Sequence, residues 1–217
     1  MVEKGTNPPG YMSNKEEEID RLKTDEDFKW VSRCQKGDVE AFEALVEKYQ
    51  KKVLNITYRM IGNYEDACEV VQEAFLSAYK GIRKFRGEAR FSTWLYSIAI
   101  NHAKNHLRKM TARFHHETAA LDDPPEMESG PGRGGSPAPE SPVVEQLEKK
   151  EIQAKVQECI NLLDEEHRTV LVLRDLQDFS YEEISDLLKI PDGTVKSRLF
   201  RARDALRDSL KKALGDL

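Results

Sequence analysis

The hydrophobic positions along this chain recur at helical spacing. Between residues 39 and 60, apolar side chains follow one another at intervals of three or four residues, which is the spacing of one helix face and not the alternation of a strand. Stripes of the same kind run through residues 67–85, 94–107, 144–163 and 195–210. The pattern therefore predicts an all-α protein.

Capping residues separate the predicted helices of the first half. Gly62 and Asn63 end the first long helix, and Asn63 together with Asp66, three residues later, can cap the next one. Ser92 is the expected cap of the third helix. We therefore expect three helices in close succession between residues 39 and 107.

Residues 180–210 carry the most informative pattern. Ser180 and Glu183 have the spacing of a capping box before a short helix, residues 190–193 predict a turn, and Thr194 is the expected cap of a long basic helix. Two helices joined by a tight glycine-containing turn predict a helix-turn-helix, whose second helix enters the major groove of DNA. An ordinary helical hairpin with a basic solvent face is the alternative. The candidate base-reading residues are Lys196, Ser197, Arg198 and Arg201.

A segment rich in proline, glycine and serine divides the chain. Residues 122–142 contain six prolines, four glycines and three serines, and no aromatic or β-branched residue. Such a composition cannot bury enough apolar surface to offset the entropy of ordering the chain. We therefore expect two small helical domains, 28–120 and 143–217, joined by a flexible linker at 121–142 and preceded by a polar extension at 1–27.

The distribution of charge favours contact with phosphates more than the total does. The net charge is −5, but residues 83–113 hold eight Lys and Arg against one acid, and residues 189–212 hold eight against three. Solvated helix faces can account for one such segment. Two of them in an acidic chain favour binding of nucleic acid.

The first basic segment is interleaved with aromatic side chains. Phe85 and Trp94 lie close in sequence to Arg86 and Arg90. Basic side chains that follow a nucleic-acid backbone, next to aromatic rings on which bases stack, suit a single strand. The same rings can equally be the core of a small helical bundle, and the sequence leaves both interpretations open.

The remaining features argue against membrane, secreted and enzymatic classes. The longest aliphatic run is Val170–Leu173, so we expect no membrane insertion and a cytoplasmic protein. Three distant cysteines without a CxxC spacing predict neither a disulfide framework nor a zinc ribbon. His102 and His106 have the i, i+4 spacing of metal ligands without an obvious acidic or cysteine partner, so a metal-dependent hydrolase is a weak alternative. We expect no metal, no cofactor and no catalytic activity.

Several short motifs follow one another along the chain. They are Gly37–Asp38 with Ala41–Phe42, Val70–Phe75, Phe85–Gly87, Phe91–Leu95, Ile98–Asn101, Ser180–Ile184 and Gly193–Arg198. Together, in this order, they resemble bacterial RNA polymerase sigma factors of the extracytoplasmic-function (ECF) group, most closely the sigma-E type. The resemblance covers residues 28–113 and 143–214.

The resemblance implies a DNA-binding transcription factor that acts on RNA polymerase. The N-terminal domain would be sigma region 2, which binds the clamp coiled coil of the β′ subunit through Glu69, Gln72 and Glu73; the family usually has Asp at the position of Glu69. The C-terminal domain would be sigma region 4, a helix-turn-helix. Further partners implied are the β flap, promoter DNA and an anti-sigma factor.

The resemblance also implies a set of DNA contacts for each domain. Region 2 would recognise the −10 element and flip a base from the strand it helps to melt, and region 4 would read the −35 element as duplex. The −10 residues would be Phe85, Arg86, Arg90, Trp94, Asn101, Lys104 and Asn105. The −35 residues would be Thr194, Lys196, Ser197, Arg198, Phe200, Arg201 and Arg203.

The spacing of the two promoter elements constrains the linker. Elements about 25 base pairs apart are separated by roughly 85 Å, whereas a flexible 21-residue chain averages about 25 Å and reaches about 70 Å when fully extended. Something must hold the linker stretched, and the family threads it through channels of the polymerase. A stand-alone helix-turn-helix regulator, which binds duplex DNA without polymerase, is the alternative function. Whether translation starts at Met1 or Met12 stays open.

Overall fold

The computed structural model describes residues 26–120 and 142–215, with side chains for 26–113 and 150–215. The predicted linker lies outside these residues except for Pro142, which is the first residue of a helix, and residues 1–25 of the N-terminal extension also lie outside them. All regular elements in the described ranges are helical, which confirms the all-α prediction. They are α2 (Glu26–Gln35), α3 (Val39–Ile61), α4 (Tyr64–Gly81), η1 (Ile82–Lys84), α5 (Phe91–Ala120), α6 (Pro142–Asn161), α7 (Glu165–Leu171), η2 (Val172–Leu176), α8 (Tyr181–Leu188) and α9 (Asp192–Leu214).

The N-terminal domain, α2 to α5, packs around the predicted stripe of α3. Val53, Ile56 and Met60 are completely buried between α4 and α5, as the helical spacing predicts. Val39 is half exposed, because it is the first residue of α3 and lies beyond the end of the packed face. Gly62 ends α3 in the left-handed region, at φ 85°, where a residue without a Cβ avoids strain.

The predicted caps are confirmed where the side chain precedes the helix. Asn63 accepts hydrogen bonds from the amides of Glu65 and Asp66 at the start of α4, at 2.8 and 3.1 Å. Ser180 and Glu183 form the predicted capping box at the start of α8.

Two other predicted caps are wrong. Ser92 lies in the first turn of α5, because that helix already begins at Phe91. Thr194 lies inside α9, which begins at Asp192, so Asp192 and Gly193 belong to the helix and not to the turn. Pro191 precedes α9 with φ −61°, close to the helical value, and it starts the helix without a side-chain cap.

The C-terminal domain consists of α6 to α9. Its helix-turn-helix, α8 and α9, packs against α6, α7 and η2. The helix α7 gives way at Val172 to the π-helical turn η2, whose Val172 and Leu173 are fully buried. Lys189, at φ 55°, ends α8 and begins the tight turn into α9. The predicted stripe of α9 is buried at Val195, Leu199 and Ala202 and half-buried further on.

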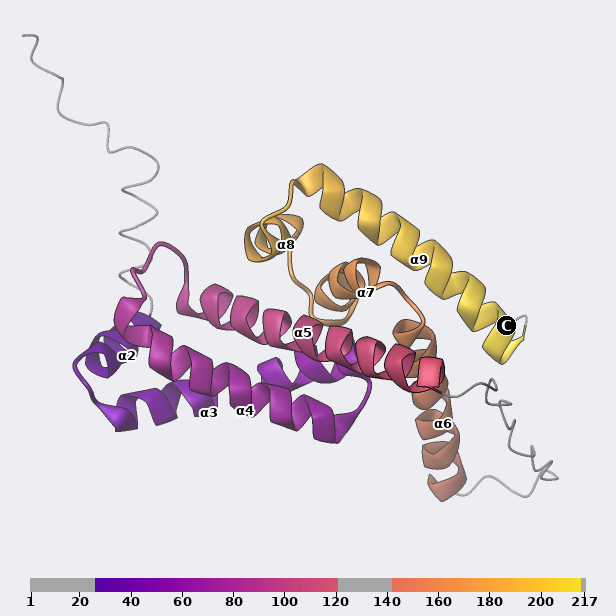
Figure 1. Cartoon of the computed structure of the whole chain (residues 1–217), viewed down its shortest axis with the longest axis horizontal. Coiled ribbons are helices and arrows are strands. Elements are labelled where there is room, and N and C mark those ends of the chain that lie inside the picture. Colours follow the sequence, from indigo (N-terminus) through magenta and orange to yellow (C-terminus); the bar gives the residue numbers. More distant parts are fainter. Residues whose placement is uncertain (1–25, 121–141, 216–217) are drawn as a thin grey trace, which may run out of the picture.

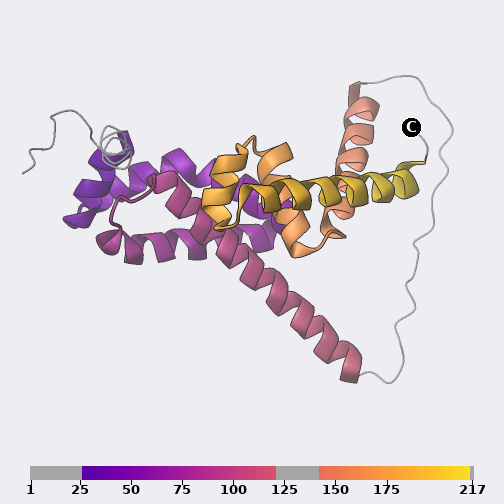
Figure 2. The same ribbon diagram turned by 90° about the horizontal axis from the view of Figure 1, so that it is seen from above.

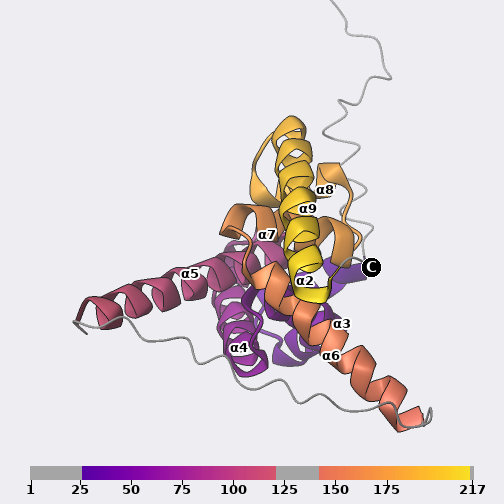
Figure 3. The same ribbon diagram turned by 90° about the vertical axis from the view of Figure 1, so that its right-hand side faces the viewer.

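The two domains pack directly against one another. The C-terminal domain lies along α5 and over the end of α3 (Figure 1), and the buried residues of both form one continuous hydrophobic cluster. Beyond this shared body the last turns of α5 project to one side and α6 extends on the other (Figures 2 and 3). No described helix is long and apolar enough to cross a membrane.

The end of α3 forms a polar clasp with α6 and α7. Arg168 is buried and donates to the carbonyl of Met60 at 2.8 Å and to the carbonyls of Asn161, the last residue of α6, and Leu163. Gln157 donates to the carbonyl of Arg59 at 3.2 Å and accepts from the Arg59 guanidinium at 3.1 Å. Carbonyls in the last turn of a helix have no partner within it, so the C-terminal domain satisfies the end of α3. A Cβ on Gly62 would overlap the Asn161 side chain.

Candidate functional site

The outer face of α4 is polar over two turns. Glu69, Gln72 and Glu73 are exposed, because the opposite face of the helix is buried through Ala67, Val70 and Ala74. The same face continues with two large apolar side chains, Leu76 and Tyr79, which are 51% and 45% exposed. This face of α4 therefore combines exposed carboxylates with two exposed apolar side chains.

The segment between α4 and α5 is held in place by a cluster of aromatic rings. The centroid of the half-buried Phe85 ring lies 4.9 Å from that of Trp94 and 6.1 Å from that of buried Phe91. Trp94 in turn packs against Gly81, where a Cβ would come within 3.2 Å of the indole. Gln35 donates to the carbonyl of Phe85 at 2.8 Å. These aromatics are therefore part of the packing of the loop.

The basic residues of the same loop face outward. Arg86 and Arg90 are exposed, and Arg86 Nη1 lies 3.8 Å from Glu88 Oε1. The aromatic cluster thus fixes the backbone while the guanidinium groups remain accessible. Such a surface can contact phosphate or a base edge without reorganising.

On α5 the −10 candidates Asn101, Lys104 and Asn105 and the nearby Arg108 have different surroundings. Asn101 and Asn105 are exposed, whereas the side chain of Lys104 is only 20% exposed. Arg108 makes a two-pronged contact with Glu165 of α7, at 3.0 and 2.9 Å, and Lys104 Nζ lies 3.8 Å from the same carboxylate. Burial lowers the pKa of Lys104 in spite of its acidic neighbour.

On α9 the predicted residues divide into an open set and a paired set. The open set is exposed on the outer face: Lys196, Ser197, Phe200 and Arg201. Arg198 pairs with Glu166 at 2.7 Å, and Arg203 donates two hydrogen bonds to Asp175, at 2.9 and 2.6 Å. This contact raises the pKa of the Arg203 guanidinium. Thr194 is half-buried in the first turn of α9.

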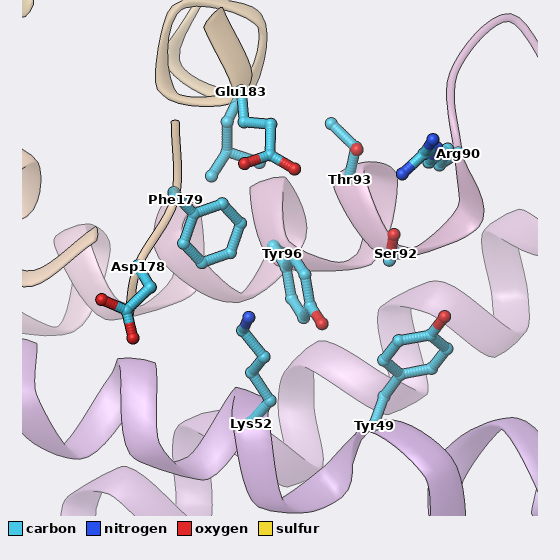
Figure 4. A pocket seen from close by; sticks show the side chains of 10 residues that line it. Tyr49, Lys52, Arg90, Ser92, Thr93, Tyr96, Asp178, Phe179 and Glu183 are labelled. Carbon is cyan, nitrogen blue, oxygen red and sulfur yellow. The ribbon is translucent and has the colours of Figure 1, made fainter. Parts of the chain in front are cut away.

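A cavity of about 230 Å³ lies where the two domains meet (Figure 4). The N-terminal domain contributes Lys52, Arg90 and Tyr96 to its lining, and the C-terminal domain contributes Phe179 and Glu183. The Lys52 ammonium lies 4.5 Å from the centre of the Phe179 ring, and the Phe179 and Tyr96 rings meet edge to face. The −10 candidate Arg90 therefore lines the same cavity as Glu183, an acidic residue of the other domain.

The two histidines of α5 face different carboxylates of α4. His102 Nδ1 lies 3.3 Å from Glu73 Oε2, and His106 Nε2 lies 3.5 Å from Asp66 Oδ2. Within the described ranges, no group of three or more His, Cys, Asp and Glu side chains could hold a metal ion. The hydrolase alternative gains no support from this geometry.

Ser77, His102 and Glu73 also share the connectivity of a Ser-His-acid triad. Ser77 Oγ lies 2.9 Å from His102 Nε2, on the ring nitrogen opposite the one that faces Glu73. Ser77 lies inside α4, however, where backbone N–H groups bond along the helix and cannot form an oxyanion hole. The arrangement lacks the donors that acyl transfer requires.

Sequence reasoning missed the acidic residues that pair with the basic ones. Glu165 and Arg108 are 57 positions apart, and no local pattern joins them. The bias of the first turn of α7 toward acids was visible, but it is equally typical of any helix start. Only the packing of the domains brings Glu165 to Lys104 and Arg108.

Comparison with known proteins matches both domains to one family. The model for sigma-70 region 2 matches residues 45–113, and the model for sigma-70 region 4 matches residues 153–206. The RNA polymerase sigma-H factor of Pseudomonas aeruginosa is 39% identical over 193 residues, which cover 89% of this chain and 98% of that protein. The ECF RNA polymerase sigma-E factor of Escherichia coli K12 is 39% identical over 181 residues, covering 83% and 92%.

Solved structures share the fold. CnrH, in complex with the cytosolic domain of CnrY, aligns with a TM-score of 0.61 at 23% identity, over 87% of this chain and 99% of that one. The sigma factor RpoE of Bartonella quintana, in complex with the anti-sigma factor NepR, aligns with a TM-score of 0.57 at 20% identity, over 78% and 96%. With these two domains and relatives that match it along most of its length, the chain belongs to the sigma-70 family, as a member of the ECF group of RNA polymerase sigma factors.

Proposed function

We propose that three surfaces of this sigma factor carry out its task, which is to bind core RNA polymerase and direct promoter-specific initiation of transcription. One surface binds polymerase, one reads the −10 element and one reads the −35 element. The polymerase-binding surface is the outer face of α4, with Glu69, Gln72 and Glu73 as its polar part. The exposed side chains of Leu76 and Tyr79 extend it. Exposed carboxylates suit a basic partner surface, and the two apolar side chains supply area that becomes buried on binding.

The −10 element is read by the loop before α5 and by the exposed face of α5. Arg86 and Arg90 hold the backbone of the melted strand, and Asn101 and Asn105 reach base edges. Phe85 and Trp94 act mainly by fixing the loop, since their rings are packed together. Lys104 joins this surface once Glu165 has moved away.

The −35 element is read by the open set on α9. The observation that carries this assignment is that Lys196, Ser197 and Arg201 are exposed on a helix whose other side is buried. Arg and Lys donate to guanine in the major groove, and Phe200 offers apolar contact to thymine methyl groups. Arg198 and Arg203 are oriented by Glu166 and Asp175, so we assign them to the DNA backbone.

Binding both elements requires the two domains to separate. The elements lie roughly 85 Å apart, and domains of this size have radii of about 13 Å, so the packed arrangement cannot reach both. Separation also exposes Lys104 and releases the exposed guanidinium of Arg108 from Glu165. The packed form therefore represents the factor away from polymerase, and the polymerase, through its clamp and its β flap, stabilises the open form.

The wider setting follows from the family. The protein acts in the cytoplasm, where the core polymerase is, and has no catalytic activity of its own. An anti-sigma factor holds it inactive, in keeping with the complexes known for structures of the same fold. Affinity purification from unstressed cells should recover such a partner, and repeated failure to recover one would contradict this part.

Run-off transcription tests the assignment. Core polymerase with and without the protein is offered a pool of promoter fragments, and discrete transcripts that need the protein are expected. Gln72→Ala with Glu73→Ala should reduce polymerase binding without changing the melting curve, because both side chains are exposed. Duplex binding by the protein alone, without polymerase-dependent transcripts, would favour a stand-alone regulator instead.

A further inference from the structure

The imidazole of His102 is bracketed by two side chains of α4. Ser77 Oγ lies 2.9 Å from Nε2, and Glu73 Oε2 lies 3.3 Å from Nδ1. Ser77 and Glu73 are four residues apart, so they stand on the same face of the helix. The ring is thus held on both nitrogens by one turn of α4.

Of the two neutral tautomers of the ring, one satisfies both contacts. A neutral imidazole has one N–H donor and one acceptor nitrogen. With the proton on Nδ1, the ring donates to the Glu73 carboxylate, and Nε2 accepts the hydroxyl proton of Ser77. The Ser77 contact therefore orients the ring, and the ring in turn orients the carboxylate.

Glu73 combines this fixed position with high exposure. Its side chain is 65% exposed, whereas that of His102 is 28% exposed. An exposed contact of this kind adds little to the stability of a fold. Its effect is to restrict the rotamers of a carboxylate that faces solvent, on the surface assigned to polymerase.

We propose that His102 is a positioning residue for polymerase binding, which holds the Glu73 carboxylate in the orientation that the polymerase accepts. The proposal rests on the assignment of Glu73 to the polymerase-binding surface. A side chain that is ordered before binding loses less conformational freedom on complex formation, and for one carboxylate this corresponds to about threefold to tenfold in affinity. His102 itself need not touch the polymerase.

The second histidine of α5 provides a matched comparison. His106 joins the same two helices, but its Nε2 is buried without a hydrogen bond, 3.5 Å from Asp66. Asp66 belongs to the first turn of α4 and is outside the assigned surface. A substitution at His106 therefore perturbs the packing of α4 on α5 without releasing Glu73.

Two variants at His102 separate positioning from packing. In His102→Asn the side-chain amide replaces Nδ1 and can still donate to Glu73. In His102→Gln the amide instead reaches the position of Nε2, so Ser77 keeps a partner and Glu73 loses one. Affinity of the full chain for core polymerase, measured by a fluorescence titration, should fall about threefold to tenfold in His102→Gln and stay within about twofold in His102→Asn, with His106→Asn close to the unsubstituted protein.

A double-mutant cycle with Glu73→Ala completes the test. If His102 acts through Glu73, His102→Gln has no further effect on affinity in the Glu73→Ala background. An equal loss in both backgrounds, or equal losses in His102→Asn and His102→Gln, would overturn the proposal. If Glu73→Ala alone leaves polymerase binding unchanged, the assignment of the α4 surface itself fails. Melting curves of all variants identify any loss that comes from unfolding.

Discussion

The two basic surfaces of this sigma factor are treated differently by the fold. On α9, Lys196 and Arg201 are exposed, although neighbouring arginines pair with acids of the same domain. On α5, Lys104 is mostly buried beside Glu165 of the other domain, and Arg108 is exposed but paired with the same carboxylate. A duplex could approach the first surface in the packed form, whereas the second becomes fully available only when the domains part.

This difference shows that the number of basic residues on a surface does not determine how many of them DNA can reach. Glu165, Glu166 and Asp175 lie within a short stretch of the C-terminal domain and each contacts an arginine. Only the contact of Glu165 crosses between domains. We call the contacts of Glu165 with Lys104 and Arg108 the electrostatic latch. Burial lowers the pKa of Lys104, so for this residue the loss of hydration outweighs the attraction of Glu165. The two-pronged contact of Arg108 is therefore the stronger part of the latch.

Removal of the clasp should have the largest effect. Arg168→Ala leaves the carbonyls of Met60 and Leu163 without their donor in a buried environment, so the free energy of unfolding should fall by at least about 3 kcal/mol. Urea unfolding of the full chain measures this fall. Arg174→Ala is the control, because Arg174 donates to the carbonyl of Phe179 within its own domain. A loss at Arg168 no larger than the loss at Arg174 would show that the clasp contributes little.

Substitutions in the open set of α9 should have the next largest effect, and this effect should be on DNA binding alone. Arg201→Ala should cost about 1–3 kcal/mol on the preferred −35 sequence, about fivefold to 150-fold in affinity, if the guanidinium reads a base. Arg203→Ala, which removes an arginine already held by Asp175, should weaken binding to all sequences alike. Quantitative binding of the polymerase complex to promoter variants measures both. A uniform loss for Arg201→Ala would assign it to phosphate.

These two arginines illustrate how far the sequence reaches. Both are −35 candidates and both are exposed, because the buried stripe of α9, which is a local property of the chain, leaves them on the outer side of the helix. The sequence pattern could not predict that Arg203 meets Asp175, 28 positions away. The same limit applies to the clasp between Arg59 and Gln157, 98 positions apart.

Sequence patterns predicted a structural feature correctly when its cause lies within a few neighbouring residues, and failed when the cause lies further away. Asn63 and Ser180 were predicted as caps because capping needs only a few neighbouring residues. One exception is the predicted cap at Thr194, which is wrong because Pro191, with its fixed φ, starts α9 earlier. Ile152 lies within the hydrophobic stripe of residues 144–163 and is nevertheless half exposed, because the periodicity of a helix does not show where its packing partner ends. The functional roles of the candidate residues stay predictions.

The buried phenol at the domain junction gives a pH dependence. Burial beside Phe179 raises the pKa of Tyr96 from 10 to about 12, so the folded form resists ionisation that the unfolded chain permits. Stability is therefore full below pH 10 and is lost as pH rises toward 12, by about 1.4 kcal/mol at pH 11. Urea unfolding at pH 9 and 11 should show this loss, and Tyr96→Phe should show less of it. Equal losses in both proteins would locate the titrating group elsewhere.

The electrostatic latch should have the smallest effect on stability and a distinct effect on domain separation. Glu165→Gln keeps the shape of the side chain and removes the charge that holds Arg108. Because the contact is largely exposed, the free energy of unfolding should change by less than about 1 kcal/mol. Energy transfer between dyes on the two domains should nevertheless report a larger separated fraction.

Salt sharpens this last prediction. Added salt screens the contact of Glu165, so it should open the unsubstituted protein more than it opens Glu165→Gln. Glu166→Gln is a matched control, since it removes the same charge from the adjacent position but breaks a pair within one domain, with Arg198. If Glu166→Gln reduced the salt dependence as much as Glu165→Gln, the latch would be an effect of the overall acidity of α7. If only Glu165→Gln does so, one carboxylate decides when the second basic surface becomes available to DNA.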